Sequence, residues 1–268
     1  MKLVVGGRDA YAYTGGKAFD AAAPCVVFVH GALHDHSVWT LLARWYANHG
    51  YTVLAPDLPG HGRSAGPPLT SVEALADWLL ALLDAAGVRQ TALVGHSMGS
   101  LVGLEAAARA PERASSLVMA GTAYPMAVSA ALLESARTRP LAAIDAVNTF
   151  SHSTFAAKPS YPGPGSSLHG GNRALMRRVQ AGCPETNLFL VDFQVCDNYR
   201  GGLEAAARAR CPVTLVLGEH DQMMRPGQAG ELAAALKART VRLAAGHALM
   251  TEAPEALLGA LKEALPGR

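Results

Sequence analysis

The sequence contains little of what marks several classes of protein. Only 16% of its 268 residues are charged, the formal net charge is +2, and the basic residues are scattered. No surface for nucleic acid or for an anionic membrane is therefore predicted. No apolar stretch approaches the ~20 residues of a membrane span, and the apolar stretch at the N-terminus is too short for a signal peptide. We expect a soluble, cytoplasmic protein.

Cysteine is scarce as well. Cys25, Cys183, Cys196 and Cys211 stand at wide, irregular spacings, and no Cys-X-X-Cys pair occurs. Buried free thiols are therefore predicted, with disulfides or a zinc site as the alternative. Half of the residues are hydrophobic, which is enough to form a large core. The length suits one α/β domain with an insertion, or two small domains.

Apolar runs alternate with helix-forming segments along most of the chain. Two short strands around a Gly-Gly turn predict a hairpin at the N-terminus. Strands are expected at 26–29, 52–55, 92–94, 116–120, 213–217 and 241–244, the first two of them buried, and helices at 39–49, 72–86, 98–110, 227–238 and 254–265. This alternation predicts an α/β fold whose mostly parallel, twisted sheet carries helices on both faces.

Residues between Gly121 and Arg210 interrupt this alternation. Helical pieces are predicted at 130–137, 141–149, 173–181 and 203–209, and the run from Lys158 to Gly171 is rich in proline and glycine. The stretch is too long for a connection inside a compact domain. We expect an inserted, mainly helical cap at 122–210 on a core formed by 1–121 and 211–268, with 158–171 as a candidate lid.

One apolar run ends in Gly95-His96-Ser97-Met98-Gly99, and a helix-forming segment follows at once. This is the layout of a nucleophile elbow, in which an abrupt strand-to-helix turn pushes the serine side chain out at the end of the sheet. Glycines on both sides give the backbone room for the turn. Taken alone, the pentapeptide is also compatible with an ordinary turn. Ser97 is thus a candidate nucleophile that needs partners.

A serine hydroxyl needs a base within hydrogen-bond reach and a third group that orients the base. Loops that follow parallel strands gather at one edge of a sheet, so the partners should lie just after strands downstream of Ser97. Asp221 follows the strand predicted at 213–217, and His247 follows the strand predicted at 241–244. The chain order serine, acid, histidine is the one expected for this elbow. Glu219, in the same turn as Asp221, is the alternative acid.

Together these features resemble the α/β-hydrolase family, in the subgroup with a helical cap between two late strands. The matching residues are His30-Gly31, the stretch 57–64, the elbow, Gly218-Glu219-His220-Asp221, Gly246-His247 and Glu252-Ala253-Pro254. The resemblance implies a sheet of about eight strands. It also implies Ser97 as nucleophile, His247 as general acid and base, and Asp221 as its orienting acid. The backbone amides of Met98 and Ala32 are expected to form the oxyanion hole.

Other residues near these motifs are weaker candidates. Gly31, Leu33, His96 and Met126 are predicted to contact substrate. His30, His34, Asp35 and His36 could suggest a metal cluster, but the oxyanion loop explains their glycine-containing stretch, and no further ligand has fitting spacing. We therefore expect no metal and no organic cofactor.

The resemblance implies acyl transfer by Ser97. Related enzymes that open epoxides or displace halide carry aspartate at the elbow, so Ser97 argues against both reactions. The largely apolar cap favours a small-molecule partner, an uncharged ester of small or medium size, and the prediction is a carboxylesterase. The nearest alternative is a lactonase or a hydrolase of carbon–carbon bonds. Hydrolases of carbon–carbon bonds often act on anionic ketones, which usually need a cationic group in the cap. The cap offers Arg137, Arg139, Arg173, Arg177 and Arg178 for this purpose. Thioesterase or acyltransferase activity, and a ligand sensor that retains the triad, also stay open.

Overall fold

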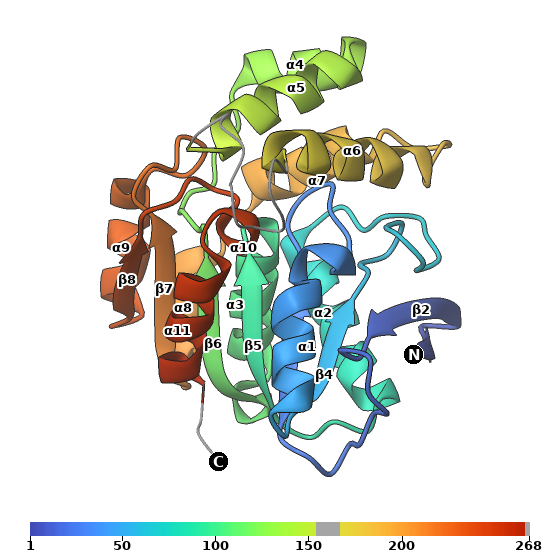
Figure 1. The fold of residues 1–268 in the computed structure, drawn as a ribbon, viewed down its shortest axis with the longest axis vertical. Helices are drawn as coiled ribbons and strands as arrows, with labels where there is room; N and C mark the ends of the chain where they lie inside the picture. The colour runs from blue at the N-terminus through green and yellow to red at the C-terminus, as the bar shows by residue number, and fades with distance from the viewer. Residues whose placement is uncertain (154–166, 266–268) are drawn as a thin grey trace.

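The fold is built on one eight-stranded sheet in the order β1-β2-β4-β3-β5-β6-β7-β8 (Figure 1). The structure is a computed structural model and describes residues 1–153 and 167–265. The first two strands and the β2–β4 pair are antiparallel, and all other neighbours are parallel. The strands are β1 Lys2–Val5, β2 Arg8–Tyr13, β3 Cys25–Val29, β4 Thr52–Pro56, β5 Thr91–His96, β6 Ala114–Ala120, β7 Val213–Gly218 and β8 Arg239–Leu243.

Helices cover both faces of the sheet, and four more lie above the carboxyl ends of its strands (Figure 1). The covering helices are α1 Thr40–Asn48, α2 Val72–Ala85, α3 Met98–Arg109, α8 Gly202–Arg208 and α11 Pro254–Ala264, with the shorter α9 Gly230–Ala235 and α10 Leu249–Glu252 beside β8 and above the sheet. The four upper helices, called the inserted helices here, are α4 Ala130–Thr138, α5 Pro140–Ser151, α6 Leu168–Ala181 and α7 Leu188–Asn198. Short 3-10 turns, η1 His36–Trp39, η2 Pro111–Arg113 and η3 Pro226–Ala229, complete the described elements.

Two apolar cores fill the space between the sheet and its helices. Strand β3 shows why: Val27 and Val29 face the core under α2 and α3, whereas Val26 and Phe28 face the core under α1 and α11. Side chains alternate between the faces of a strand, so an uninterrupted apolar run is expected where both faces are covered. The predicted α/β fold with a mostly parallel sheet is confirmed.

The inserted segment differs from its sequence-based description at several points. Helix α7 was not predicted, because its apolar and polar residues are mixed without a clear stripe. Helix α6 begins at Leu168, so the last residues of the candidate lid are helical; residues 158–166 of that lid lie outside the described residues. Helix α8 packs against α3 of the core layer. The division into a core of 1–121 and 211–268 and a cap of 122–210 stays a prediction.

No helix within the described residues has the length and apolar character needed to cross a membrane. The four cysteines are free thiols, and Cys25 and Cys196 are buried. Burial raises the pKa of the Cys25 thiol to about 12, so this thiol is neutral and packs as an apolar side chain.

Candidate active site

The candidate residues meet at the carboxyl edge of the sheet, beneath the inserted helices. Ser97 follows β5, Asp221 follows β7, and His247 follows β8; the loop with Ala32 follows β3. Because these strands are parallel, their carboxyl ends lie at the same edge, and residues more than 100 positions apart in sequence become neighbours.

The turn at Ser97 has the strained geometry expected of an elbow. Its φ is 52° and its ψ is −121°, a conformation that a non-glycine residue rarely adopts. A Cβ atom on Gly95 would overlap the carbonyl of Gly99, and a Cβ on Gly99 would overlap the carbonyl of Val29. Both glycines are therefore required by the close approach of α3 to β5 and β3. The Ser97 amide donates to the carbonyl of Ala120 on β6 at 2.9 Å, which anchors the turn to the sheet.

His247 and Asp221 form the closest polar contact of the site. The Nδ1 of His247 lies 2.7 Å from Oδ2 of Asp221, and both residues are buried. The other oxygen, Oδ1, accepts from the amides of Met223 and Met224 at 2.8 Å each. With Nδ1 donating to the carboxylate, Nε2 carries the lone pair that a general base needs. The alternative acid, Glu219, is exposed, and among the hydrogen bonds and ion pairs of the described residues none joins it to His247.

The backbone of His247 is fixed from both sides. Its carbonyl accepts from Nε2 of His96 at 2.9 Å, and the amide of the preceding Gly246 donates to Oε2 of Glu252 at 3.2 Å. Glu252 is itself buried and also accepts from the Ser153 amide at 3.0 Å. Sequence reasoning used Glu252 only as a family motif and missed this bracing role, which no local pattern indicates.

Ser97 and His247 line one small cavity. Among the described residues, no hydrogen bond joins the Ser97 hydroxyl to the His247 ring. Catalytic hydrogen bonds in unliganded sites are often long and tighten only when substrate is bound. The candidate nucleophile and the candidate base therefore lie on the surface of one cavity.

The two amides predicted for the oxyanion hole have no acceptor within the described part of the chain. Ala32 and Met98 are both buried. A buried backbone N–H without a partner is rare, because it costs about 1 to 3 kcal/mol of lost hydrogen bonding. Two such groups at the same strand edge are the donors that a developing oxyanion would use.

The cavity at Ser97 has a volume of about 30 Å³, which is room for about one water molecule. Of the residues predicted to contact substrate, Gly31, His96 and Met126 line it, and Leu33 does not. The remaining lining residues, which sequence reasoning did not assign to the pocket, are His34, Val128, Val147, Ser151, Phe193, Cys196, Met223 and Met224. Most come from the inserted helices and the turn after Asp221.

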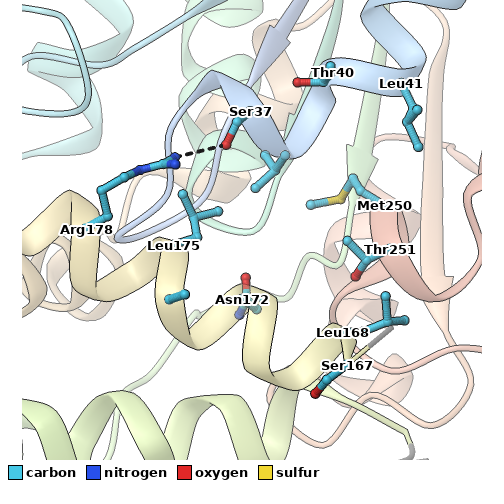
Figure 2. Close-up of a pocket in the computed structure, with 13 residues that line it drawn as sticks. Ser37, Thr40, Leu41, Ser167, Leu168, Asn172, Leu175, Arg178, Met250 and Thr251 are labelled. Atoms are coloured by element: carbon cyan, nitrogen blue, oxygen red, sulfur yellow. Dashed lines mark hydrogen bonds between the residues drawn. The ribbon is translucent and has the colours of Figure 1, made fainter. Parts of the chain in front are cut away.

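Two larger grooves flank this cavity. One, of about 470 Å³, lies between α4, α5 and the turn after β7, and it shares Val128, Val147, Phe193, Met223 and Met224 with the cavity at Ser97. The other, of about 490 Å³, lies between α6 and the segment that includes α1 (Figure 2). Oδ1 of its lining residue Asn172 lies 2.8 Å from Nε2 of His34, and His34 lines the cavity. We call these the α4–α5 groove and the α6 groove.

The buried histidines near Ser97 are uncharged. Burial, and then the charge of nearby His247, lower the pKa of His96 far below its usual value. Burial also lowers the pKa of His30 to about 4 and that of His34 below its usual value. The cavity therefore gains no positive charge from these rings at neutral pH.

Asp35, His36 and Asp57 also lie close together, with ligand atoms within 4.8 Å of one another. Their oxygens are already engaged: Asp57 accepts from the amides of His36 and Arg63 at 2.8 and 2.9 Å, and Asp35 accepts from the amide of Ser37 at 2.9 Å. This hydrogen bonding shapes the loops after β3 and β4, in agreement with the structural role expected for an aspartate in such a turn.

Comparison with known proteins places these features in context. A model of the alpha/beta hydrolase family matches residues 26–260. Over 118 residues the chain is 37% identical to the dihydrolipoyllysine-residue acetyltransferase component of the acetoin cleaving system of Cupriavidus necator, a match to 43% of this chain and 30% of that protein. The chain covers only about a third of the length of the curated relatives it matches.

Solved structures match over nearly the whole chain. An enol-lactonase from Burkholderia xenovorans is 23% identical with a TM-score of 0.79, and 98% of each chain is covered. An esterase from Exiguobacterium antarcticum is 14% identical with a TM-score of 0.82, again with 98% of each chain covered. At these identities, the likeness establishes the shared fold.

Proposed function

Because the chain belongs to the alpha/beta hydrolase family, we propose that it is a serine carboxylesterase that cleaves an uncharged, largely apolar ester through an acyl-enzyme. One observation carries the proposal: the strained Ser97, the His247–Asp221 pair and two unpartnered buried amides lie together at one edge of the sheet. Each group is expensive to maintain in a folded protein, and together they are the parts that acyl transfer needs.

The reaction proceeds in two halves. Ser97 Oγ attacks the ester carbonyl while His247 Nε2 takes the hydroxyl proton, and the carbonyl oxygen becomes an oxyanion held by the amides of Ala32 and Met98. His247 then passes the proton to the leaving alcohol, and the acyl group stays on Ser97. A water molecule, deprotonated by His247, releases the acid. Asp221 holds the imidazole tautomer throughout.

The lining of the site supports an uncharged substrate. Within the described residues, no charged side chain lines the α4–α5 groove, and none of the five arginines considered above lines that groove or the cavity at Ser97. Arg137 pairs with Glu134, Arg173 with Asp145, and Arg178 with Asp35. Arg178 lines the α6 groove instead, where it pairs with Asp35, so an anionic ketone bound beside Ser97 or in the α4–α5 groove would lack the cationic partner that such substrates need.

The α4–α5 groove supports an ester with an apolar arm. The cavity at Ser97 is too small for an ester, so its lining side chains must move when substrate binds. Met223 and Met224 stand between the cavity and the groove, and methionine is the most adaptable apolar side chain. Their rotation joins the two spaces into one pocket.

A panel of aryl esters with acyl chains of two to ten carbons tests the proposal, with wild type and Ser97→Ala measured side by side. We expect repeated turnover by wild type and loss of activity in the variant. Hydrolysis by Ser97→Ala at the wild-type rate would contradict the mechanism. A single burst without turnover would indicate the ligand-sensing alternative, and preference for lactones or for anionic ketones over esters would move the assignment to those reactions.

A further inference from the structure

The peptide group between Ala32 and Leu33 is held at both of its polar atoms. Its N–H, which belongs to Leu33, donates to Oδ2 of Asp192 at 2.7 Å. Its carbonyl, which belongs to Ala32, accepts from Nδ1 of His34 at 2.7 Å. Asp192 lies on α7, one of the inserted helices, so a residue far away in sequence fixes the loop after β3.

Leu33 adopts a backbone conformation that leucine avoids. Its φ is 52°, in the left-handed region, and its side chain is fully buried. A non-glycine residue stays in this region only when the surrounding contacts determine it. The hydrogen bond from its amide to Asp192 is such a contact, and it fixes the peptide group next to the one that carries the Ala32 N–H.

Asp192 is also half of a buried ion pair. Its Oδ2 lies 2.9 Å from Nε2 of His61, and each side chain is 2% exposed. The Nδ1 of His61 faces the carbonyl of Pro59 at 3.1 Å, so both ring nitrogens face acceptors, an arrangement that favours the doubly protonated ring. Burial opposes this charge, but the Asp192 carboxylate raises the pKa of His61 above its usual value.

A buried ion pair rarely stabilises a fold more than apolar side chains of the same volume. The position of the pair suggests another use, because one oxygen of the Asp192 carboxylate accepts hydrogen bonds from both the Leu33 amide and the His61 ring. Through Leu33 it contacts the loop after β3, and through His61 it contacts the loop after β4. The pair therefore joins α7, the loop after β3 and the loop after β4, next to the amide of Ala32 whose orientation the oxyanion hole requires.

We propose that Asp192 is a positioning residue for the oxyanion hole, and that it links the seating of α7 to the direction of the Ala32 amide. The proposal rests on the proposed function. When α7 is seated, Asp192 holds Leu33 in its left-handed conformation and the Ala32 N–H stays free for the oxyanion. When α7 is displaced, Leu33 loses its partner and the hole loses one donor.

Substitution Asp192→Asn tests this link. Both bonds converge on the single oxygen Oδ2, so an amide oxygen can stand in its place but carries no charge. Charge-assisted hydrogen bonds are roughly twice as strong as neutral ones, so the bond that holds the Leu33 amide is weakened and a protonated His61 loses its counter-charge. With a short acetyl ester, we expect kcat to fall about tenfold to a hundredfold, because misplacing a catalytic group by about 1 Å costs up to about a hundredfold. KM should change by less than about twofold. Affinity for an aryl trifluoromethyl ketone, whose adduct with Ser97 carries an oxyanion, should fall by the same factor as kcat.

The matched control is Glu134→Gln, in which another carboxylate of the inserted helices loses its charge. Glu134 is exposed and pairs with Arg137 on the same helix, so kcat and inhibitor affinity should stay at wild-type values. If Asp192→Asn fails to fold, His61→Gln replaces it: glutamine can donate to Asp192 without charge, and a kcat loss of at least about threefold at constant KM is expected.

The inference is overturned if the folded Asp192→Asn variant keeps wild-type kcat and inhibitor affinity, or if only KM rises. Unchanged kcat and inhibitor affinity in a folded His61→Gln variant, used in its place, would overturn it as well. These results are separable from failure of the proposed function. An inactive Ser97→Ala variant together with an unaffected Asp192→Asn variant removes only the positioning role, whereas an active Ser97→Ala variant removes the mechanism itself.

Discussion

The loops at the carboxyl edge of the sheet and the inserted helices above them hold their charged groups in different ways. At the edge, buried carboxylates such as Asp57, Asp221 and Glu252 each accept hydrogen bonds from backbone amides. In the inserted helices, the pair Arg137–Glu134 is largely exposed, the pair Arg173–Asp145 is partly exposed, and the α4–α5 groove is lined mainly by apolar residues.

Under the proposed function, the loops at the edge of the sheet carry the chemistry, and the inserted helices determine which substrate is accepted. Carboxylates that accept hydrogen bonds from backbone amides hold the loops in place, and reacting groups need this because a misplacement of about 1 Å can cost about a hundredfold in rate. Apolar contacts allow side chains to repack at small cost, which a pocket must do to admit substrate. Asp192 is the exception, because it stands on an inserted helix but bonds to the edge as Asp221 and Glu252 do.

The largest effect is expected at the edge, from His247→Ala. Loss of the base should lower kcat/KM by at least about 10⁴-fold on an aryl ester, and adding Ser97→Ala should lower it little further, because triad members act as a unit. Steady-state kinetics of the single and double variants measure this. Independent, additive losses would show that the two residues do not cooperate.

The next effect distinguishes the two acids. Asp221→Asn should cost about 10⁴-fold in kcat, because an amide no longer selects the His247 tautomer that leaves Nε2 free. Glu219→Gln, two residues away and exposed, is the control and should keep the wild-type rate. The reverse result, with Glu219 essential and Asp221 dispensable, would transfer the role of the acid to Glu219.

A smaller loss is expected from Ala32→Pro, which removes an amide hydrogen and leaves the rest of the site in place. One oxyanion donor is worth about 10² to 10³ in rate. Ala32→Gly retains the N–H and should remain close to wild type. Equal activity of the proline and glycine variants, with circular dichroism spectra like that of wild type, would remove Ala32 from the oxyanion hole.

The buried pair His61–Asp192 should affect stability in a pH-dependent manner. Breaking it by Asp192→Asn should lower the free energy of unfolding by about 3 kcal/mol, the usual cost of leaving one buried charge unpaired. Because the pKa of His61 is raised in the folded protein, its contribution is fully present below its ordinary pKa of 6.5 and is lost as the pH rises through the folded value. Urea unfolding of both proteins at a series of pH values above that ordinary pKa should show the difference shrinking. A difference that grows with pH would contradict the charged form of His61.

The smallest effect is expected from Arg137→Ala on α4. Its pair with Glu134 has both side chains 60% exposed, and such pairs contribute about 0 to 1 kcal/mol. The free energy of unfolding should change by less than about 1 kcal/mol, and kcat/KM should match wild type. A large loss of activity would mean that the inserted helices contribute charge to the site after all.

The sequence by itself determined the fold and the order of the candidate site. The two-sided burial of β3 to β7 follows from uninterrupted apolar runs, and the glycines of the elbow follow from close backbone approach at Gly95 and Gly99. These features depend on neighbours in the chain or on a repeated local pattern, which is why they are legible without a structure. Helix α7 escaped prediction because its stabilising contacts are tertiary.

Only the tertiary structure brought Asp192 to Leu33 and His61, Glu252 to Gly246, and Asn172 to His34. Each contact joins residues whose separation in sequence carries no periodic signal, and each depends on how a helix docks over loops. The elbow, the acid and the histidine are fixed by the ends of strands, whose positions follow from topology. The contacts that orient the proposed oxyanion donors and line the pocket are instead set by packing between separate segments. Hydrogen bonds and apolar contacts across a fold depend on distance in space, which the sequence does not show.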